Sequence, residues 1–457
     1  MKKIESKYLF FFIFLTLSII GGLLIFSEPH LFWDEGIYIN NAKYIYSSGE
    51  QSTYENIRPP LFSLIIGLSI PLGIDIILFS KIFIFLCFIL AIVFIYLISE
   101  KIKKDSGLFS AIILSTCSLI LYILPHTLTD FIVLTFMLIA FYFFLSKKYF
   151  FTGLFCGISI LLRFPSGLLL IIFGLFLITK DIKQTIKYWI FLILGALFFI
   201  APYLLFNKIL FNSFLNPIIN AQLIVAQGSS SFFTTAWFFI KVLMIQNLIL
   251  LFLIIFVLLI IFKKIKNKDY FLLLFVCLLY FIYFSQLPHY EERYIILLIP
   301  FGAIISGITI SYFSKKLKTI SYLLLFILLF ITLVYSINNF ITSNTDTEIR
   351  FIKDIKEIDT NILFISDPIL GIYFDRKIKY MVNPYYTNQF LEKYPDFSYL
   401  IFSDRFLECD ITCMDCGEIN HCIETKKFKE IILNNWILIK TERIYGINYY
   451  IYKKITI

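Results

Sequence analysis

Charged residues are scarce in this sequence: Asp, Glu, Lys and Arg make up 16% of its 457 residues, whereas 59% are hydrophobic and 19% aromatic. A soluble domain needs more polar surface than this, so the composition excludes an ordinary soluble globular protein. The net charge of +9 does not indicate a nucleic-acid partner. Most of the lysines lie in short segments between apolar runs, where basic residues orient membrane spans.

Other missing features narrow the function. No Gly-x-x-x-x-Gly-Lys loop is present, which leaves a preactivated donor or a gradient as the energy source instead of a nucleoside triphosphate. No Ala-x-Ala-like cleavage site follows the first apolar segment, Tyr8–Phe26, so we expect a retained span rather than a signal peptide. No internal repeat of the kind found in many transporters is visible.

Long apolar runs dominate what is present, and runs of about 18 to 25 residues cross a bilayer as helices. We expect about eleven crossings. Two of these are short helices that meet at Arg163–Pro165, because the apolar stretch between lysines 147–148 and 180–187 begins and ends on one side. Ile37–Tyr46 and Leu61–Leu72 read as interfacial helices. The other spans are expected near 8–26, 75–99, 107–125, 131–146, 188–206, 235–262, 269–286, 294–313 and 319–337.

The distribution of basic residues predicts the orientation. The segments placed inside hold eighteen Lys or Arg, and those placed outside hold four. The inside segments are 2–7, 100–106, 147–148, 180–187, 263–268 and 315–318, and the outside segments are 27–60, 125–130, 207–234 and 287–293. This asymmetry predicts a multi-pass protein of the cell membrane with a cytoplasmic N-terminus and an extracytoplasmic C-terminal region.

The last part of the chain changes character. We divide the sequence into an all-α polytopic membrane domain at 1–337, with a first outer loop at 27–60, and a small extracytoplasmic α/β domain at 338–457. Thr347–Ile358 is expected to be helical, and Asn361–Ser366 and Tyr399–Ser403 to be strands. The C-terminal end is expected to form a hairpin of strands near 436–441 and 449–453 around Gly446.

Cysteines fall into two groups. Cys87, Cys117, Cys156 and Cys277 lie in apolar runs, where a thiol packs as a small hydrophobic group. Four more lie in the polar C-terminal region: Cys409, Cys413, Cys416 and Cys422. In an oxidising compartment these predict two disulfides, and the alternative is a zinc site, because Cys413-x-x-Cys416 has ligand-like spacing and His421 is nearby.

Two polar clusters stand in the first outer loop. Asp34 and Glu35 follow the first span, and either begin a helix or serve as a general base and a ligand for a divalent ion. Arg58 precedes two prolines, and either reaches the membrane interface or binds phosphate through its guanidinium fork.

Two further clusters lie on the same predicted outer face. Arg163 is an intramembrane charge and by default a functional residue, whereas Asp130 reads first as the N-cap of the next span. The loop before residue 294 is rich in ionisable groups and forms either a solvated set of salt bridges or one wall of a site. These groups are His289, Glu291, Glu292 and Arg293.

Together these clusters suit transfer from a lipid phosphate, because cations stabilise a departing phosphate and a carboxylate deprotonates the acceptor. The order and common face of the motifs resemble the C-type glycosyltransferase superfamily, and within it the dolichyl-phosphate-mannose protein mannosyltransferase and aminoarabinose transferase group. The motifs are Trp33-Asp34-Glu35-Gly36, Arg58-Pro59-Pro60-Leu61, Asp130 and His289-Tyr290-Glu291-Glu292-Arg293-Tyr294. The last is similar to the His-Lys-Glu-Glu-Arg-Phe signature of lipid-linked mannosyltransferases, with two tyrosines as departures.

The resemblance covers roughly residues 1–337 and implies an inverting transfer from a polyprenyl-phosphate sugar to a protein, lipid or glycan acceptor. It implies that Asp34 is the base and that Glu35 contacts the acceptor or a metal. Arg58, Arg163 and Arg293 become candidates for the donor phosphate, with Arg163 the least supported by the family pattern. Some relatives need Mg or Mn and others do not, so metal dependence is left open. No Trp-Trp-Asp signature of oligosaccharyltransferases is present.

Two other classes compete with the enzyme. A transporter or lipid-linked sugar flippase predicts charges near the bilayer midplane and inverted repeats, whereas here the charges gather at one face. A structural membrane protein that binds partners through its outer domain would leave Asp34 and Arg58 replaceable.

Overall fold

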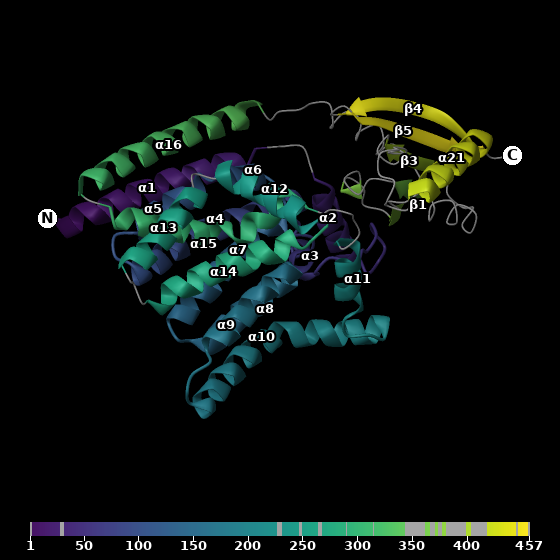
Figure 1. Ribbon diagram of the computed structural model, residues 1–457. Coiled ribbons are helices and arrows are strands. Elements are labelled where there is room, and N and C mark those ends of the chain that lie inside the picture. The colour runs from purple at the N-terminus through teal and green to yellow at the C-terminus, as the bar shows by residue number, and fades with distance from the viewer. Residues whose placement is uncertain are drawn as a thin grey trace. The chain divides into compact units, whose positions relative to one another are not determined.

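The computed structural model describes residues 2–27, 32–225, 231–245, 249–263, 267–288, 290–313 and 315–342, and shorter stretches at 362–365, 371–372, 377–380, 399–403, 418–444 and 447–455. The described chain is mostly helical, with a small sheet toward the C-terminus (Figure 1). It divides into two compact units. The first contains Met1–Ser27, Ile57–Leu61 and Ser80–Thr342, and the second contains Glu28–Asn56, Phe62–Phe79 and Ser343–Ile457.

The first unit is a bundle of apolar helices. Its elements are α1 (Lys2–Ile25), α4 (Ile76–Ile102), α5 (Gly107–Ser115), α6 (Ser118–Ile123), α7 (Thr129–Leu145), α8 (Tyr149–Leu162), η1 (Phe164–Ser166), α9 (Gly167–Phe176), α10 (Ile182–Phe211), α11 (Asn216–Val225), α12 (Phe232–Ile245), α13 (Ile249–Lys263), α14 (Lys268–Ser285), η2 (Glu292–Leu297), α15 (Ile299–Ser311) and α16 (Lys315–Thr342). Many large apolar side chains on α10 and α16 are exposed, as a lipid-facing surface requires.

Four helices within the described residues are long and apolar enough to cross a bilayer: Ile76–Ile102, Ile182–Phe211, Lys268–Ser285 and Thr319–Asn338. Shorter apolar helices accompany them at Phe11–Ile25, Thr129–Leu145, Tyr149–Leu162, Phe164–Phe176, Phe232–Met244, Leu251–Ile261 and Ile299–Ser311. These helices confirm a multi-pass membrane fold, whereas the expected number of crossings stays a prediction.

The span expected at 107–125 is not one continuous helix. It consists of α5 and α6, and Cys117 between them has an extended backbone with φ −65° and ψ 127°. The hydroxyls of Ser115 and Thr116 donate to the carbonyls of Ala111 and Ile112 at 2.8 and 2.7 Å. Hydroxyls that bond back in this way bend a helix, and apolar content alone does not reveal the break. Within the span expected at 235–262 the structure describes α12 and α13, and residues 246–248 lie outside the described residues.

The pair of short helices expected between 149 and 179 is confirmed. Helix α8 ends at Leu162, Arg163 is extended with φ −157° and ψ 114°, and Pro165 lies in η1 before α9 begins. A proline removes a backbone donor and disfavours a helical residue before it, so the local sequence ends α8 here.

Helices α8 and α10 approach each other closely because glycines line their contact. A Cβ atom on Gly153 would lie 1.9 Å from the carbonyl oxygen of Leu192, and one on Gly195 would lie 2.0 Å from that of Phe150. Gly157 lies one turn beyond Gly153 and meets the backbone of Ala196. This is the small-residue spacing that lets membrane helices pack backbone to backbone. Figure 1 shows α10 bent, and its interior contains Pro202.

The second unit contains the first outer loop. Helix α2 (Trp33–Tyr46) includes the interfacial helix expected at 37–46. Helix α3 (Leu61–Gly67) is shorter than the expected segment 61–72. In α2, Glu35 and every residue from Gly36 to Lys43 are buried, and the Tyr38 ring packs edge-on against the Phe62 ring at 5.2 Å.

The C-terminal sheet has five strands in the order β2-β1-β3-β5-β4. They are β1 (Ile362–Ile365), β2 (Lys377–Tyr380), β3 (Tyr399–Ser403), β4 (Trp436–Ile444) and β5 (Ile447–Lys454), and α21 (Glu418–Asn435) precedes β4. Strand β1 is parallel to β2 and β3, whereas β5 is antiparallel to β3 and β4. Leu400 and Phe402, two apart on β3, pack with Phe428, Ile432 and Trp436 into a small core.

This sheet confirms the expected α/β class, both expected strands and the hairpin. Strand β2 and helix α21 were not predicted, and the helix expected at 347–358 lies outside the described residues. The domain boundary between residues 337 and 338 stays a prediction. Cys87, Cys117, Cys156 and Cys277 are buried free thiols, as expected. Cys409, Cys413 and Cys416 lie outside the described residues, as does the side chain of Cys422, so disulfides and zinc stay alternatives.

Candidate active site

A buried ion pair joins two of the predicted site residues. The carboxylate of Asp130 pairs with the guanidinium of Arg163, and their side chains are 3% and 15% exposed. Asp130 lies in the first turn of α7, whose N-cap is Leu128, so the expectation that Asp130 caps this helix is wrong. The helix begins at Thr129, so Asp130 lies inside its first turn, and its carboxylate pairs with Arg163 at the break between α8 and α9.

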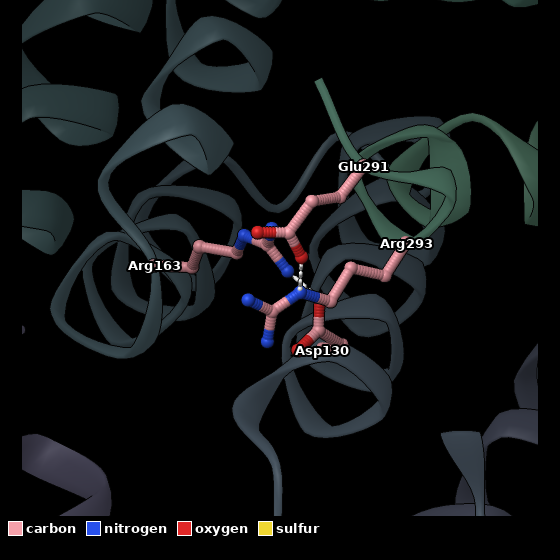
Figure 2. Close-up of polar contacts among 4 residues, drawn as sticks. All are labelled: Asp130, Arg163, Glu291 and Arg293. Carbon is pink, nitrogen blue, oxygen red and sulfur yellow. Dashed lines mark hydrogen bonds and ion pairs between the residues drawn. The ribbon is translucent and has the colours of Figure 1, made fainter. Parts of the chain in front are cut away.

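A second ion pair lies beside the first. Arg293 in η2 pairs with Glu291, which directly precedes η2. The guanidinium of Arg163 lies over the ring of Tyr294, with its central carbon 5.4 Å from the ring centre. Figure 2 shows the side chains of Asp130, Arg163, Glu291 and Arg293 pointing toward one another. We call these four residues the charged cluster, and its two carboxylates balance its two guanidiniums.

The remaining residues of the predicted loop differ in burial. Glu292 is exposed, whereas Tyr294 is buried and stacks near Phe284 with ring centres 6.0 Å apart. His289 lies outside the described residues. The sequence placed Arg163, Asp130 and this loop on one face, and the structure gathers four of their charged groups at one place.

Lys81 is a cation that the sequence analysis did not single out. It lies in α4 within an apolar run, is 9% exposed, and donates to the backbone carbonyl of Ser27 at 2.8 Å. Its neighbour Ser80 is hydrogen-bonded to Thr127 at 3.0 Å, three residues before Asp130. Lys81 therefore lies at the same end of the helical unit as the charged cluster. A lone lysine inside an apolar span is itself the signal that could have identified it.

Asp34 and Glu35 occupy the first turn of α2 in the second unit. Phe32, not Asp34, is the N-cap, so the alternative that Asp34 caps this helix is wrong. The carboxylate of Glu35 accepts a hydrogen bond from the backbone N–H of Phe32 at 2.9 Å, and Glu35 is 1% exposed. Glu35 thus closes the start of the helix, as expected for an acid at the third position. Asp34, one residue earlier, is half-buried.

Arg58 is half-buried in the irregular stretch before α3. The two prolines that follow it restrict its backbone, as the sequence indicated. Its proposed contact with a donor phosphate stays a prediction.

The described residues do not assemble a metal-binding set. No group of three or more His, Cys, Asp or Glu side chains gathers anywhere in this part of the chain. Hard divalent cations such as Mg²⁺ need several oxygen ligands, usually with carboxylates among them. A requirement for Mg or Mn stays a prediction.

The charged cluster has the chemistry of an anion site. Two guanidiniums next to each other, each partly shielded from solvent, can bind the oxygens of a phosphate through charge-assisted hydrogen bonds. Asp130 and Glu291 neutralise these cations, which keeps them tolerable inside a membrane-embedded bundle. An anionic ligand would have to compete with the two carboxylates for the arginines.

Comparisons with known proteins show the family of the chain and its fold. The family model of the Alg9-like mannosyltransferases matches residues 41–378, which is well over half of the chain. No curated protein matches the chain in sequence.

Solved structures share the fold. ArnT from Cupriavidus metallidurans, bound to undecaprenyl phosphate, has a TM-score of 0.70 at 12% identity, over 98% of this chain and 98% of that chain. The archaeal oligosaccharyltransferase AglB from Archaeoglobus fulgidus, in complex with an inhibitory peptide and a dolichol-phosphate, has a TM-score of 0.59 at 11% identity, over 97% and 74%. The arabinofuranosyltransferase AftD from Mycobacteria has a TM-score of 0.54 at 11% identity, over 96% and 40%. The shared architecture is the C-type glycosyltransferase fold.

Proposed function

This chain belongs to the Alg9-like mannosyltransferase family and is a membrane glycosyltransferase, and on that premise we propose how it transfers its sugar. The donor is a hexose carried on a polyprenyl phosphate, and the acceptor is a hydroxyl group outside the cytoplasm. The anomeric carbon is inverted in a single displacement. Family membership favours this enzyme over a transporter, a flippase or a purely structural membrane protein.

The observation that carries the proposal is the charged cluster. Arg163 and Arg293 are cations at one end of a bundle of apolar helices. Lys81 adds a third cation at the same end. A phosphate ester held by these groups is the chemical requirement for a lipid-phosphate donor. ArnT bound to undecaprenyl phosphate and AglB bound to a dolichol-phosphate, both of the same fold, support this donor class.

The chemical step needs a base and a stabilised leaving group. The oxygen of the acceptor hydroxyl attacks the anomeric carbon while the bond from that carbon to the phosphate oxygen breaks. The hydroxyl proton passes to the carboxylate of Asp34, and the bonding electrons leave with the polyprenyl phosphate. The arginines stabilise the charge that develops on this phosphate, as oriented cations do in phosphoryl chemistry.

Asp34 suits the role of base better than Glu35. Glu35 is buried and closes the start of α2 through the N–H of Phe32. Asp34 is half-buried and does not occupy the N-cap. We therefore assign proton acceptance to Asp34 and a supporting role to Glu35, and we keep Arg58 and the loop residues His289 and Glu292 as further donor contacts.

The first test is sugar transfer by membranes that contain the wild-type protein or the Asp34→Asn variant. With radiolabelled polyprenyl-phosphate hexoses as donors, we expect the variant to lose transfer by at least about 100-fold, the usual contribution of a general base. The matched control is Glu50→Gln, an exposed acid in the same loop, which should transfer sugar at the wild-type rate.

Two outcomes would contradict the proposal. Equal transfer by Asp34→Asn and wild type would remove Asp34 as the base. A wild-type protein that transfers no hexose from the panel, but moves a lipid-linked sugar between leaflets of a vesicle, would establish a flippase instead.

A further inference from the structure

Helix α2 carries Asp34 at its start and is held at its far end by a short segment of the C-terminal region. The ammonium of Lys43 donates to the backbone carbonyl of Ile372 at 2.6 Å. Both residues are buried, at 7% and 4% exposure. The two residues belong to the same compact unit, although 329 positions separate them in the sequence.

The neighbouring residues fit the same contact closely. A Cβ atom on Gly371 would lie 2.7 and 2.8 Å from the amide nitrogen and oxygen of Asn40. A larger residue at 371 would therefore require the Asn40 side chain to move. Asn40 itself is 1% exposed and lies one helical turn before Lys43. We call the set Asn40, Lys43, Gly371 and Ile372 the rear contact.

The opposite face of α2 is held in a different way. The side-chain amide of Asn41 donates to the carbonyl of Glu55 at 2.9 Å and accepts from its N–H at 2.7 Å. Seven residues separate Asn41 from Asp34, so about two helical turns bring them to one face. Lys43 lies nine residues from Asp34, which places it about half a turn away. The rear contact therefore lies on the side of α2 opposite to Asp34.

We propose that Lys43 and the Gly371–Ile372 segment are positioning elements that fix the orientation of α2, and with it the carboxylate of Asp34. The inference rests on the proposed role of Asp34. A lysine is otherwise an expensive residue to bury, and a full hydrogen bond from its ammonium to a carbonyl compensates part of that cost. The C-terminal region thereby contributes to sugar transfer without touching the donor or the acceptor.

The first experiment replaces Lys43 by Met, which keeps the aliphatic stem and removes the ammonium. Loss of orientation at the reacting centre should lower kcat by about 10-fold or more and leave the KM for the polyprenyl-phosphate hexose unchanged. The matched control is Lys426→Met, an exposed lysine of α21 in the same unit, which should retain the wild-type kcat. An unchanged kcat in Lys43→Met, or a rise in KM alone, would overturn the proposal.

A cross-link tests the contact directly, without relying on a change in activity. In the Asn40→Cys/Gly371→Cys double variant, the two sulfurs fall within reach, because the Cγ atom of Asn40 lies 3.1 Å from the position that a Cβ atom on residue 371 would occupy. A distance of about 3 Å is what an ordinary disulfide places between one sulfur and the opposite Cβ. The cross-linked peptide is detected by mass spectrometry, and the singly substituted Asn40→Cys protein, oxidised in parallel, is the control.

The activity of the cross-linked enzyme shows whether the Gly371–Ile372 segment stays on α2 during sugar transfer or must leave it. If the rear contact positions α2, the oxidised double variant transfers sugar at least as fast as its reduced form, and the cross-link restores kcat in the Lys43→Met background. Inactivation that reduction reverses would show that the segment must leave α2, and an absent cross-link would show that the contact does not form; either overturns the proposal. If the wild-type protein transfers no sugar, the proposed function is wrong. If it transfers sugar but the cross-link does not form, only the rear contact is wrong.

Discussion

The ion pair between Asp130 and Arg163 is expected to be the most sensitive polar contact in the helical unit. Asp130 is almost fully buried, and Arg163 also lies over the Tyr294 ring. Removing one member of a buried pair leaves the other charge without its counterion, which typically costs about 3–5 kcal/mol. Each charge of the pair therefore makes the burial of the other less costly.

We predict that Asp130→Leu and Arg163→Met each lower the free energy of unfolding by about 3–5 kcal/mol, and that the double variant loses less than the sum. The measurement is the unfolding midpoint in detergent for the four proteins of the cycle. Glu50→Gln, an exposed acid, serves as the control and should change stability by less than about 0.5 kcal/mol. Additive losses would show that the two side chains do not interact in the folded protein.

For single residues, the sequence predicted which side chains matter better than it predicted which side chains they contact. Arg163 stood out because a charge inside an apolar run is unusual. Asp130 was noticed for the wrong reason, since its helix begins earlier than expected, at Thr129, and Leu128 takes the N-cap. Lys81 carries the same signal as Arg163 and was overlooked. Pairing of Asp130 with Arg163 depends on how α7 and α8 pack, which residue type alone does not specify.

Among the elements, α8 and α10 illustrate how small residues determine a helix pair. Gly153, Gly157 and Gly195 line a contact in which a single added methyl group would meet backbone atoms. Backbone cannot move aside as a flexible side chain does, so the helices themselves would have to separate.

We predict that Gly153→Ala lowers the free energy of unfolding by about 1–3 kcal/mol, as overpacking of a tight interior usually does. Gly174→Ala in α9 is the matched control, because nothing lies within 4 Å of its Cβ position. Alanine favours helices, so the control should be neutral or more stable by up to about 1 kcal/mol. Thermal unfolding in detergent compares them, and equal midpoints for both variants would contradict the close approach.

Elements were predicted well where a local pattern determines them. Arg163-Phe164-Pro165 revealed the break between α8 and α9, a strand-like run revealed β3, and two such runs around Gly446 revealed the β4–β5 hairpin. The break between α5 and α6 was missed because hydropathy is continuous across Cys117, and it depends on hydroxyl groups that bond to the backbone. Helix α21 carries Phe428 and Ile432 one turn apart, a weak apolar pattern that becomes meaningful only against the sheet.

For the whole molecule, the asymmetry of basic residues predicts the orientation. We expect alkaline phosphatase fused after Thr342 or after Ile457 to be active in a bacterial host, because the enzyme works only outside the cytoplasm. Fusions after Lys148 or Asp181 should be inactive, because these positions lie in lysine-rich inner segments. Active fusions at the inner positions and inactive ones at the C-terminal positions would reverse the orientation, and with it the compartment of the acceptor.

Composition determined the class of this protein almost entirely, because few folds tolerate such apolar helices outside a membrane. The family could be predicted because several short motifs follow one another along the chain in the order expected for it. The division into units was less accessible: residues 28–56 group with the C-terminal region across nearly the whole sequence. Contacts such as that of Lys43 with Ile372 join distant segments and leave no trace in local periodicity.

The break at Arg163 also bears on how the protein is made. Helices α8 and α9 have 14 and 10 residues, or about 21 and 15 Å of helix, against a hydrocarbon thickness of about 30 Å. Neither helix is long enough to span the hydrocarbon core alone. We therefore expect the two to enter the bilayer together as a hairpin. Helix α7 is made earlier and already packs on α8, with the Phe143 and Phe155 rings stacked 5.4 Å apart, whereas the glycine-lined face of α8 has no partner until Gly195 of α10 emerges. A ribosome that stalls between α9 and α10 would thus leave an intermediate for membrane quality control to remove.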